Sequence, residues 1–167
     1  MRATLEVARM TWARSLWRET MRSVHDVAAY ILHKTGKITA IKLHKLLYYS
    51  QAWSLVWDDK PLFNARIEAW ANGPVVPSVY RLHRGNYFVS SWPAGNRNAL
   101  DQDERDTVNV VVNKYGKKSS QWLSELTHRE RPWIAARRGL GPLDPGDQEI
   151  TKASMAEYYN SLMRHEH

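Results

Sequence analysis

The chain has 167 residues, of which 43% are hydrophobic and 25% are charged, so it is long enough for one globular domain and too short for two full ones. The absence of cysteine excludes disulfides, cysteine-liganded zinc, iron–sulfur clusters and a thiol nucleophile, and it fits a reducing cytoplasm. A net charge of +7 raises nucleic-acid or membrane-surface binding as a question, while eight tryptophans and eight tyrosines favour partner binding.

The start of the chain is basic and lacks the continuous apolar core of a signal peptide. Spaced apolar residues from Leu5 to Trp17 would suit an amphipathic helix resembling an organellar transit segment, but a loosely attached extension is the simpler interpretation. Because the first well-patterned segment follows Met21, we predict a dispensable basic extension over residues 1–20 and a functional domain over residues 21–167. No run approaches the roughly 18 apolar residues of a membrane-spanning helix, so no membrane partner is expected.

The first two elements of the domain are predicted to be helices. Apolar residues recur at helical spacing from Val24, and Gly36 follows as a stop, which predicts an amphipathic helix over 24–33. The next helix, 39–57, starts at Thr39 and is apolar on nearly every face. Since such a helix is normally the buried centre of its domain, we predict a mainly α fold, a compact single-domain helical bundle around it.

The middle of the chain is less regular. Weak alternation over 66–70 suits a short strand or an extended loop, and the turn residues 72–74 follow. Pro77 and Gly85 then bracket a short helix, because proline favours the first helical turn and glycine the exit. Residues 86–100 are expected to form an irregular loop with at most one strand. The helical bundle therefore leaves room for one short β-hairpin.

The C-terminal third is expected to be helical. Asp101 and Glu104 have the spacing of a capping box, and Gly116 marks the end of that helix. Residues 139–146 form a loop rich in glycine and proline. Three further helix starts are marked by capping residues or proline: Ser119 or Ser120, Pro132 and Thr151.

The sequence offers no convergent set of catalytic residues. None of the seven histidines forms a pair with zinc-protease spacing, and the terminal His165–His167 segment lies at an end expected to fray. Phosphate-loop, dinucleotide-binding and nucleophile-elbow motifs are absent from the sequence. We therefore predict a protein that is not an enzyme and has no cofactor and no metal site.

Nucleic-acid binding is the alternative of another class. Six arginines would form a basic surface with Trp133 or Tyr80 if they gathered in the fold, but acidic residues interrupt them and no helix-turn-helix, zinc-finger or RNP motif is present. Nucleic acid is therefore an unlikely partner. The arginines are Arg81, Arg84, Arg129, Arg131, Arg137 and Arg138.

An ordered set of short motifs resembles a known family. The set comprises Lys42–Trp53 (KLHKLLYYSQAW), Lys60–Phe63 (KPLF), Ile67–Trp70 (IEAW), Gly73–Tyr80 (GPVVPSVY) and Leu123–His128 (LSELTH) with Pro132 and Trp133. In this order they resemble the Panacea antitoxin domain family, the SocA-like family that includes phage-associated GepA-like proteins. The resemblance runs from about Val24 to Tyr159, and the chain departs from the expected pattern at His44, where glutamine is more usual.

This resemblance implies a cytoplasmic antitoxin from a bacterium or phage. Its partner would be a cognate toxin encoded by a neighbouring gene and neutralised by direct protein–protein binding, without catalysis. The alternative mechanism is a proteolytic adaptor that delivers the toxin to a AAA+ protease such as ClpXP. The toxin's identity does not follow from the resemblance.

The segment from Gly73 to Arg81 is our main candidate for the toxin-binding surface. Aromatic and arginine side chains are frequent interface anchors, and the glycine and prolines would preorganise the segment. The alternative is that the segment is structural, with its valines packed on the central helix, and that the interface follows residues of that helix. The predicted toxin-binding residues are Gly73, Pro74, Val75, Pro77, Tyr80, Arg81, Lys45, Tyr48, Tyr49 and Trp53.

Overall fold

The computed structural model describes residues 22–165, so the predicted extension over 1–20 lies outside the described residues. Helices dominate, with two small antiparallel sheets, which confirms the predicted mainly α fold with a short hairpin. The elements in chain order are α2 (Val24–Thr35), β1 (Ile38–Thr39), α3 (Ala40–Trp57), β2 (Glu68–Trp70), β3 (Gly73–Val75), α4 (Pro77–His83), β4 (Phe88–Val89), α5 (Gln102–Tyr115), α6 (Ser120–His128), α7 (Arg131–Ala136) and α8 (Lys152–His165).

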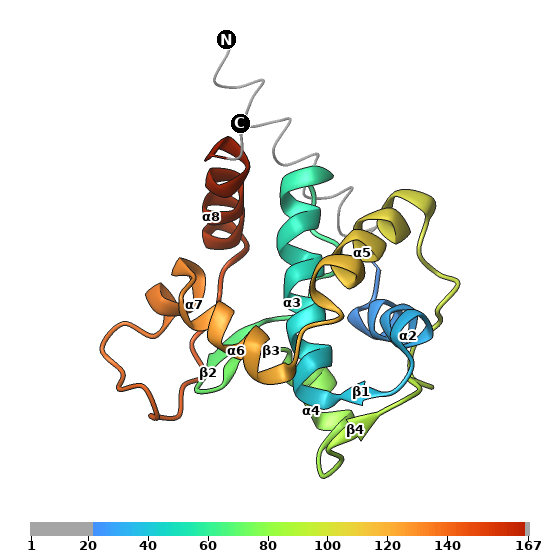
Figure 1. The fold of residues 1–167 in the computed structure, drawn as a ribbon, viewed down its shortest axis with the longest axis horizontal. Helices are drawn as coiled ribbons and strands as arrows, with labels where there is room; N and C mark the ends of the chain where they lie inside the picture. The colour runs from blue at the N-terminus through green and yellow to red at the C-terminus, as the bar shows by residue number, and fades with distance from the viewer. Residues whose placement is uncertain (1–21, 166–167) are drawn as a thin grey trace.

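The central helix α3 organises the fold. The hydroxyl of Thr39 accepts the backbone N–H of Lys42 at its start, as the capping prediction required. Helices α2 and α5 pack on one side of α3 and α8 on the other, while α6 crosses near its first turns (Figure 1). Thirteen positions of α3, Ala40 and the twelve from Leu43 to Ser54, are buried because neighbouring elements cover every face of the helix. Within the described residues, no helix combines the length and apolar character needed to cross a membrane.

The predicted capping box of α5 is present, and its Glu104 also binds Arg22 at the start of the described residues. The backbone N–H of Glu104 donates to Asp101 Oδ1 over 2.9 Å, and the Asp101 N–H donates to Glu104 Oε1 over 2.8 Å. Glu104 Oε1 also accepts from Arg22 Nε at 2.9 Å, and the Arg22 backbone N–H donates to Leu62. These contacts attach Arg22, the first described residue, to the start of α5 and to the segment that precedes β2.

The hairpin pairs β2 with β3 in antiparallel register, Ala69 opposite Pro74 and Trp70 opposite Gly73. The turn therefore precedes Gly73, whereas the sequence predicted a turn that included Gly73 and Pro74. Proline is tolerated in β3 because both strands of a two-stranded sheet are edge strands. The missing N–H of Pro74 therefore removes no hydrogen bond to a further strand. The other sheet pairs β1 with β4, which are about fifty residues apart in the chain and carry no local hairpin signal.

Candidate functional site

A cavity of about 890 Å³ lies between the start of α3, the β2–β3 hairpin and α4. Two loops, 85–87 and 143–147, contribute the remaining lining. Its size is within the range of ligand-binding pockets, and a few polar groups converge among apolar walls, which makes it the candidate site. The lining side chains with rings or charges that matter most are Lys45, Glu68, Trp70, Tyr80, His83 and Tyr87.

The hairpin wall depends on a glycine. Gly73 has φ +111°, a conformation that side chains with a Cβ rarely adopt. Its open face is filled by the side chain of Lys45, whose Nζ donates to the carbonyl of Pro74 over 3.0 Å. A Cβ at Gly73 would lie 2.7 Å from Lys45 Cε and 2.8 Å from Thr127 Oγ1. The absence of a side chain at Gly73 therefore lets Lys45 cross beneath the hairpin.

Gly73→Ala is expected to lower the free energy of unfolding by about 2 kcal/mol or more, because it adds backbone strain to a steric clash. Gly36→Ala is the matched control, since Gly36 also has a positive φ of +71° but a Cβ there would meet nothing within 4 Å. Thermal melts of both variants measure the difference. Equal losses would show that the Lys45 contact imposes no constraint on position 73.

Lys45 is the buried charge of the cavity. Only 1% of the residue is exposed, and burial lowers the pKa of its ammonium to about 7. Among the described residues it forms no ion pair, and its hydrogen bond to Pro74 uses one of its three donors. Lys45 therefore changes its charge near neutral pH.

His44 on α3 and His83 on α4 contact each other through their Nε2 atoms, 2.7 Å apart. The backbone N–H of Val76 donates to His44 Nδ1, so this nitrogen carries no proton. His44 then donates from Nε2 to His83 Nε2, which leaves the His83 proton on Nδ1. Burial lowers the pKa of both rings, so the neutral forms prevail at pH 7. His83 Nδ1 is buried and has no hydrogen-bond partner among the described residues.

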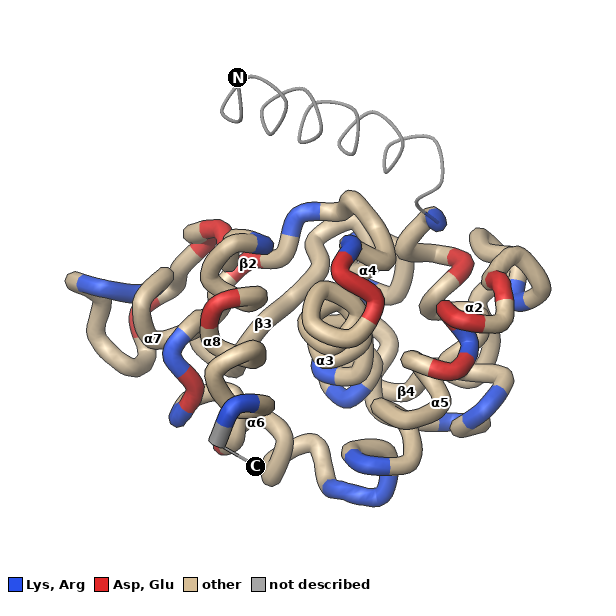
Figure 2. Tube along the Cα trace, turned by 90° about the horizontal axis from the view of Figure 1, so that it is seen from above, with Lys and Arg blue, Asp and Glu red and all other residues tan. Residues whose placement is uncertain are grey.

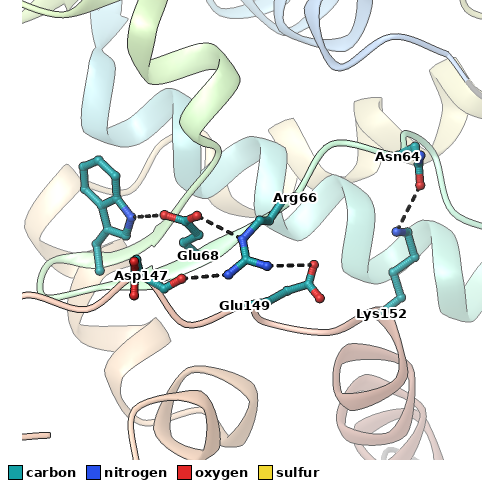
Figure 3. Close-up of polar contacts among 7 residues, drawn as sticks. Asn64, Arg66, Glu68, Asp147, Glu149 and Lys152 are labelled. Carbon is teal, nitrogen blue, oxygen red and sulfur yellow. Dashed lines mark hydrogen bonds and ion pairs between the residues drawn. The ribbon is translucent and has the colours of Figure 1, made fainter.

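Arg66 links the 143–147 loop, one wall of the cavity, to strand β2 of the hairpin (Figure 3). Its guanidinium donates to Glu68 Oε2 over 3.0 Å and to the Asp147 carbonyl over 2.8 Å, and it lies 3.7 Å from a Glu149 carboxylate oxygen. The backbone N–H of Ala69 also donates to the Gln148 carbonyl over 2.8 Å and adds to this attachment. The loop that closes the cavity is therefore held by both side-chain and backbone contacts.

Arg137 secures the other end of the same loop from inside. It is 5% exposed and donates to three backbone carbonyls, those of Ala69, Gly141 and Asp144, at 2.6 to 3.0 Å. These bonds link α7, the hairpin and the loop. The sequence placed Arg137 in a possible basic surface, whereas the structure buries it as a structural connector.

The rim of the cavity is aromatic and apolar. Tyr80 packs edge-on against Trp70, with ring centroids 4.9 Å apart, and both side chains are half-buried. Tyr87 is 68% exposed, and Ile41 and Leu143 are also exposed. Large apolar side chains that gather around a cavity are typical of a surface that meets a partner.

The structure brings some of the predicted residues to this site. Val75, Tyr80 and Lys45 line the cavity. Gly73 and Pro74 form β3 beside it, and Pro77 begins α4. Arg81 is exposed on α4. Of the segment Gly73–Arg81, Val75 and Tyr80 therefore line the cavity, while Val76 and Val79 are buried in the core.

The structure places Tyr48, Tyr49 and Trp53 in the core instead, each at most 3% exposed. Tyr49 donates to Glu130 Oε1 over 2.5 Å, and the Tyr159 hydroxyl lies 3.0 Å from the same oxygen and 3.1 Å from the Tyr48 hydroxyl. Trp53 Nε1 donates to the Tyr115 hydroxyl. These side chains satisfy polar groups inside the domain and offer no surface to a partner in this conformation.

Sequence reasoning missed several residues of the cavity. His83 and Tyr87 were assigned no role, because neither belongs to a recognisable motif. Trp70 was quoted only as part of a motif, and the 143–147 loop only as a connection. The one available signal was His44, the departure from the family pattern, which in the structure contacts His83.

The described residues provide no obvious metal site, since no group of three or more His, Asp or Glu side chains is placed to hold an ion. Chemically, the cavity offers N–H donors, aromatic faces and apolar walls. Such an arrangement suits recognition of a partner group.

Comparison with known proteins identifies the family. The family model described as antitoxin SocA-like, Panacea domain, matches residues 43–134, more than half of the chain. This chain belongs to the SocA-like Panacea family. It is 31% identical over 119 residues to the protein named Antitoxin SocA of Caulobacter vibrioides, and the alignment spans 62% of each chain. No solved structure matches the chain. The resemblance expected from the motifs is confirmed, and the Panacea match includes the hairpin and α4 but not the 143–147 loop.

Proposed function

We propose that this Panacea domain is a cytoplasmic antitoxin that neutralises a cognate toxin, encoded by a neighbouring gene, through direct protein–protein binding. Membership of an antitoxin family supports the general role. The observation that supports direct binding is the cavity with its exposed aromatic rim beside Gly73–Arg81. Neutralisation of this kind needs a surface and no catalytic group.

The toxin contacts the rim in this proposal, with Tyr80 and Arg81 as anchors. Tyr80 is half-buried against Trp70, so its position is fixed before binding and little conformational entropy is lost. Arg81 is exposed on the next position of α4. Val75 lies deeper, in the hairpin wall. The core residues Tyr48, Tyr49 and Trp53 have no part in this surface.

Tyr80→Ala is expected to weaken toxin binding by about 2 kcal/mol or more, since a preordered aromatic anchor is removed from the interface. Titration of the neighbour-encoded toxin into the variant measures the change, and a circular dichroism melt separates folding from binding. Trp122→Ala is the matched control, because Trp122 is an exposed aromatic side chain, 37% exposed, on α6 outside the cavity. If the folded Tyr80 variant binds as the wild type does, the interface lies elsewhere.

The distribution of charge gives little support to the nucleic-acid alternative. Figure 2 shows the Lys and Arg positions of the described chain spread over many elements, with Asp and Glu between them. Binding to nucleic acid depends on phosphate contacts from clustered basic side chains and weakens steeply with salt. Salt-sensitive retention of DNA or RNA by the purified protein would reverse this ranking.

The fate of the toxin separates the two antitoxin mechanisms. Sequestration protects the toxin as a folded complex, whereas an adaptor shortens its lifetime. A pulse-chase measurement of toxin half-life with and without this protein therefore decides between them. A half-life that falls when this protein is present would favour delivery to a AAA+ protease.

We also propose that residues 1–20 are dispensable for folding and neutralisation. A chain that starts at Met21 is expected to keep its melting temperature, because it retains the Arg22–Glu104 ion pair and the Ser23 cap of α2. A chain that starts at Val24 loses both and is expected to melt several degrees lower, since about 1 kcal/mol corresponds to roughly 2–4 °C in a domain of this size. Calorimetry of the two chains measures this. A fall already at the Met21 start would mean that the extension contacts the domain.

A further inference from the structure

Two side chains that line the cavity, Lys45 and His83, have N–H groups that lack hydrogen-bond acceptors among the described residues. Lys45 Nζ has one acceptor, the Pro74 carbonyl, and among the described residues no carboxylate pairs with it. On the α4 side, the proton that the histidine contact leaves on His83 Nδ1 has no acceptor in the described chain. Buried donors without acceptors are uncommon, because each one forgoes the hydrogen bonds it would make in water.

The acidic residues that line the cavity do not supply the missing acceptor. Glu68 accepts from Arg66 Nε through one oxygen and from Trp70 Nε1 through the other, and no hydrogen bond or ion pair joins it to Lys45. Asp147 is exposed, and its backbone carbonyl rather than its carboxylate receives Arg66. The other titratable groups near Lys45 include the histidines His44, His83 and His128, which carry no negative charge. Glu125 on α6 also acts on His128, but it is exposed and forms no ion pair with Lys45.

We infer that the cavity receives an acidic side chain, an aspartate or glutamate on an apolar segment of the toxin, and that its carboxylate binds the ammonium group of Lys45. The inference rests on the proposed function, since it names the chemical group by which the toxin enters the site. The His83 N–H provides a second donor for the same segment. Lys45 thus acts as a selectivity group inside a mainly apolar pocket.

The shape of the surface favours a polypeptide over a small carboxylate. Ile41 and Tyr87 line the cavity and are exposed, and the ring of Phe88, which is not part of the lining, packs edge-on against Tyr87. A free metabolite would leave this apolar rim uncovered. A protein segment with apolar residues beside its acidic residue would cover the rim and fill the cavity together.

The test compares toxin binding to the wild type, Lys45→Met and Lys42→Met by calorimetric titration at pH 6.5, 7.5 and 8.5. Lys42 is the matched control, because it lies on the same helix, is more accessible and does not line the cavity. We expect Lys45→Met to bind about tenfold more weakly or worse at pH 6.5, and Lys42→Met to bind like the wild type.

The pH dependence tests the same inference on the unmodified protein. If the carboxylate binds only charged Lys45, wild-type affinity falls by about tenfold or more from pH 6.5 to 8.5, while Lys45→Met shows no such slope. Equal affinities and equal slopes for wild type and Lys45→Met would overturn the inference and leave the proposed function standing. Absence of any toxin binding by the wild type would refute the proposed function itself.

Variants of the toxin identify the occupant. Substituting its aspartates and glutamates one at a time by asparagine or glutamine is expected to reveal one position whose loss matches that of Lys45→Met and adds nothing to it. If only removal of the toxin's C-terminal carboxylate has this effect, the acidic side chain is the wrong occupant. If acetate alone raises the melting temperature of wild type but not of Lys45→Met, a small carboxylate occupies the site instead.

Discussion

Lys45→Met is expected to raise the free energy of unfolding at pH 7 by roughly 2–4 kcal/mol. Lowering the pKa of Lys45 from 10.5 to about 7 corresponds to almost 5 kcal/mol at about 1.4 kcal/mol per pH unit, and methionine escapes this cost. The Pro74 carbonyl loses its hydrogen-bond donor, which destabilises the variant by about 1–3 kcal/mol. The variant expected to bind toxin less well is therefore expected to be the more stable protein.

The lowered pKa of Lys45 also sets the direction in which the stability of the wild type changes with pH. Between pH 7 and 10.5 the folded protein binds fewer protons at Lys45 than the unfolded chain does, so wild-type stability rises with pH through this window. Tyr48 and Tyr49, whose pKa values are raised by burial, oppose this trend only above about pH 10. Denaturant melts at pH 7, 8 and 9.5 should show a rising wild-type stability and a smaller change for Lys45→Met. Parallel curves would mean that Lys45 is solvated in the folded protein.

Tyr49→Ala is expected to destabilise the domain by about 4 kcal/mol or more and to unfold much of it. Tyr49 is fully buried, its ring stacks on Tyr115 at 4.1 Å, and its hydroxyl donates to Glu130. Truncation therefore leaves a cavity and removes one of the two tyrosine hydroxyls that meet a buried carboxylate. Urea unfolding followed by far-ultraviolet circular dichroism measures the loss.

Tyr49→Phe is the matched variant for the hydroxyl. It keeps the ring and the stacking, so the expected loss is about 1–3 kcal/mol, the cost of the hydrogen bond to Glu130. The difference between the two variants separates packing from hydrogen bonding. A folded, equally stable Tyr49→Ala that binds toxin poorly would instead make Tyr49 a surface anchor and contradict its burial.

The positions of the tyrosines show where sequence reasoning reached its limit. The all-round apolar character of residues 39–57 correctly predicted a central helix, because such a helix is stable only when neighbours cover every face. The apolar pattern of residues 39–57 does not show which side chains of the helix are fully buried and which are exposed to a partner. Tyr48 and Tyr49 were candidates for a toxin surface because a tyrosine hydroxyl suits either an interface or a satisfied core. Their burial follows from partners far along the chain, Glu130 for Tyr49 and Tyr159 for Tyr48.

The sequence by itself determined the helices, their caps and the family, since these depend on residues close together in the chain or on ordered motifs. The tertiary structure decided the cavity, because its walls come from α3, the hairpin, α4 and the 143–147 loop. Arg66 and Arg137 attach that loop to the hairpin. It also decided the state of Lys45 and His83. Burial and hydrogen-bond partners set their proton affinities, and both arise from contacts between residues far apart in the chain.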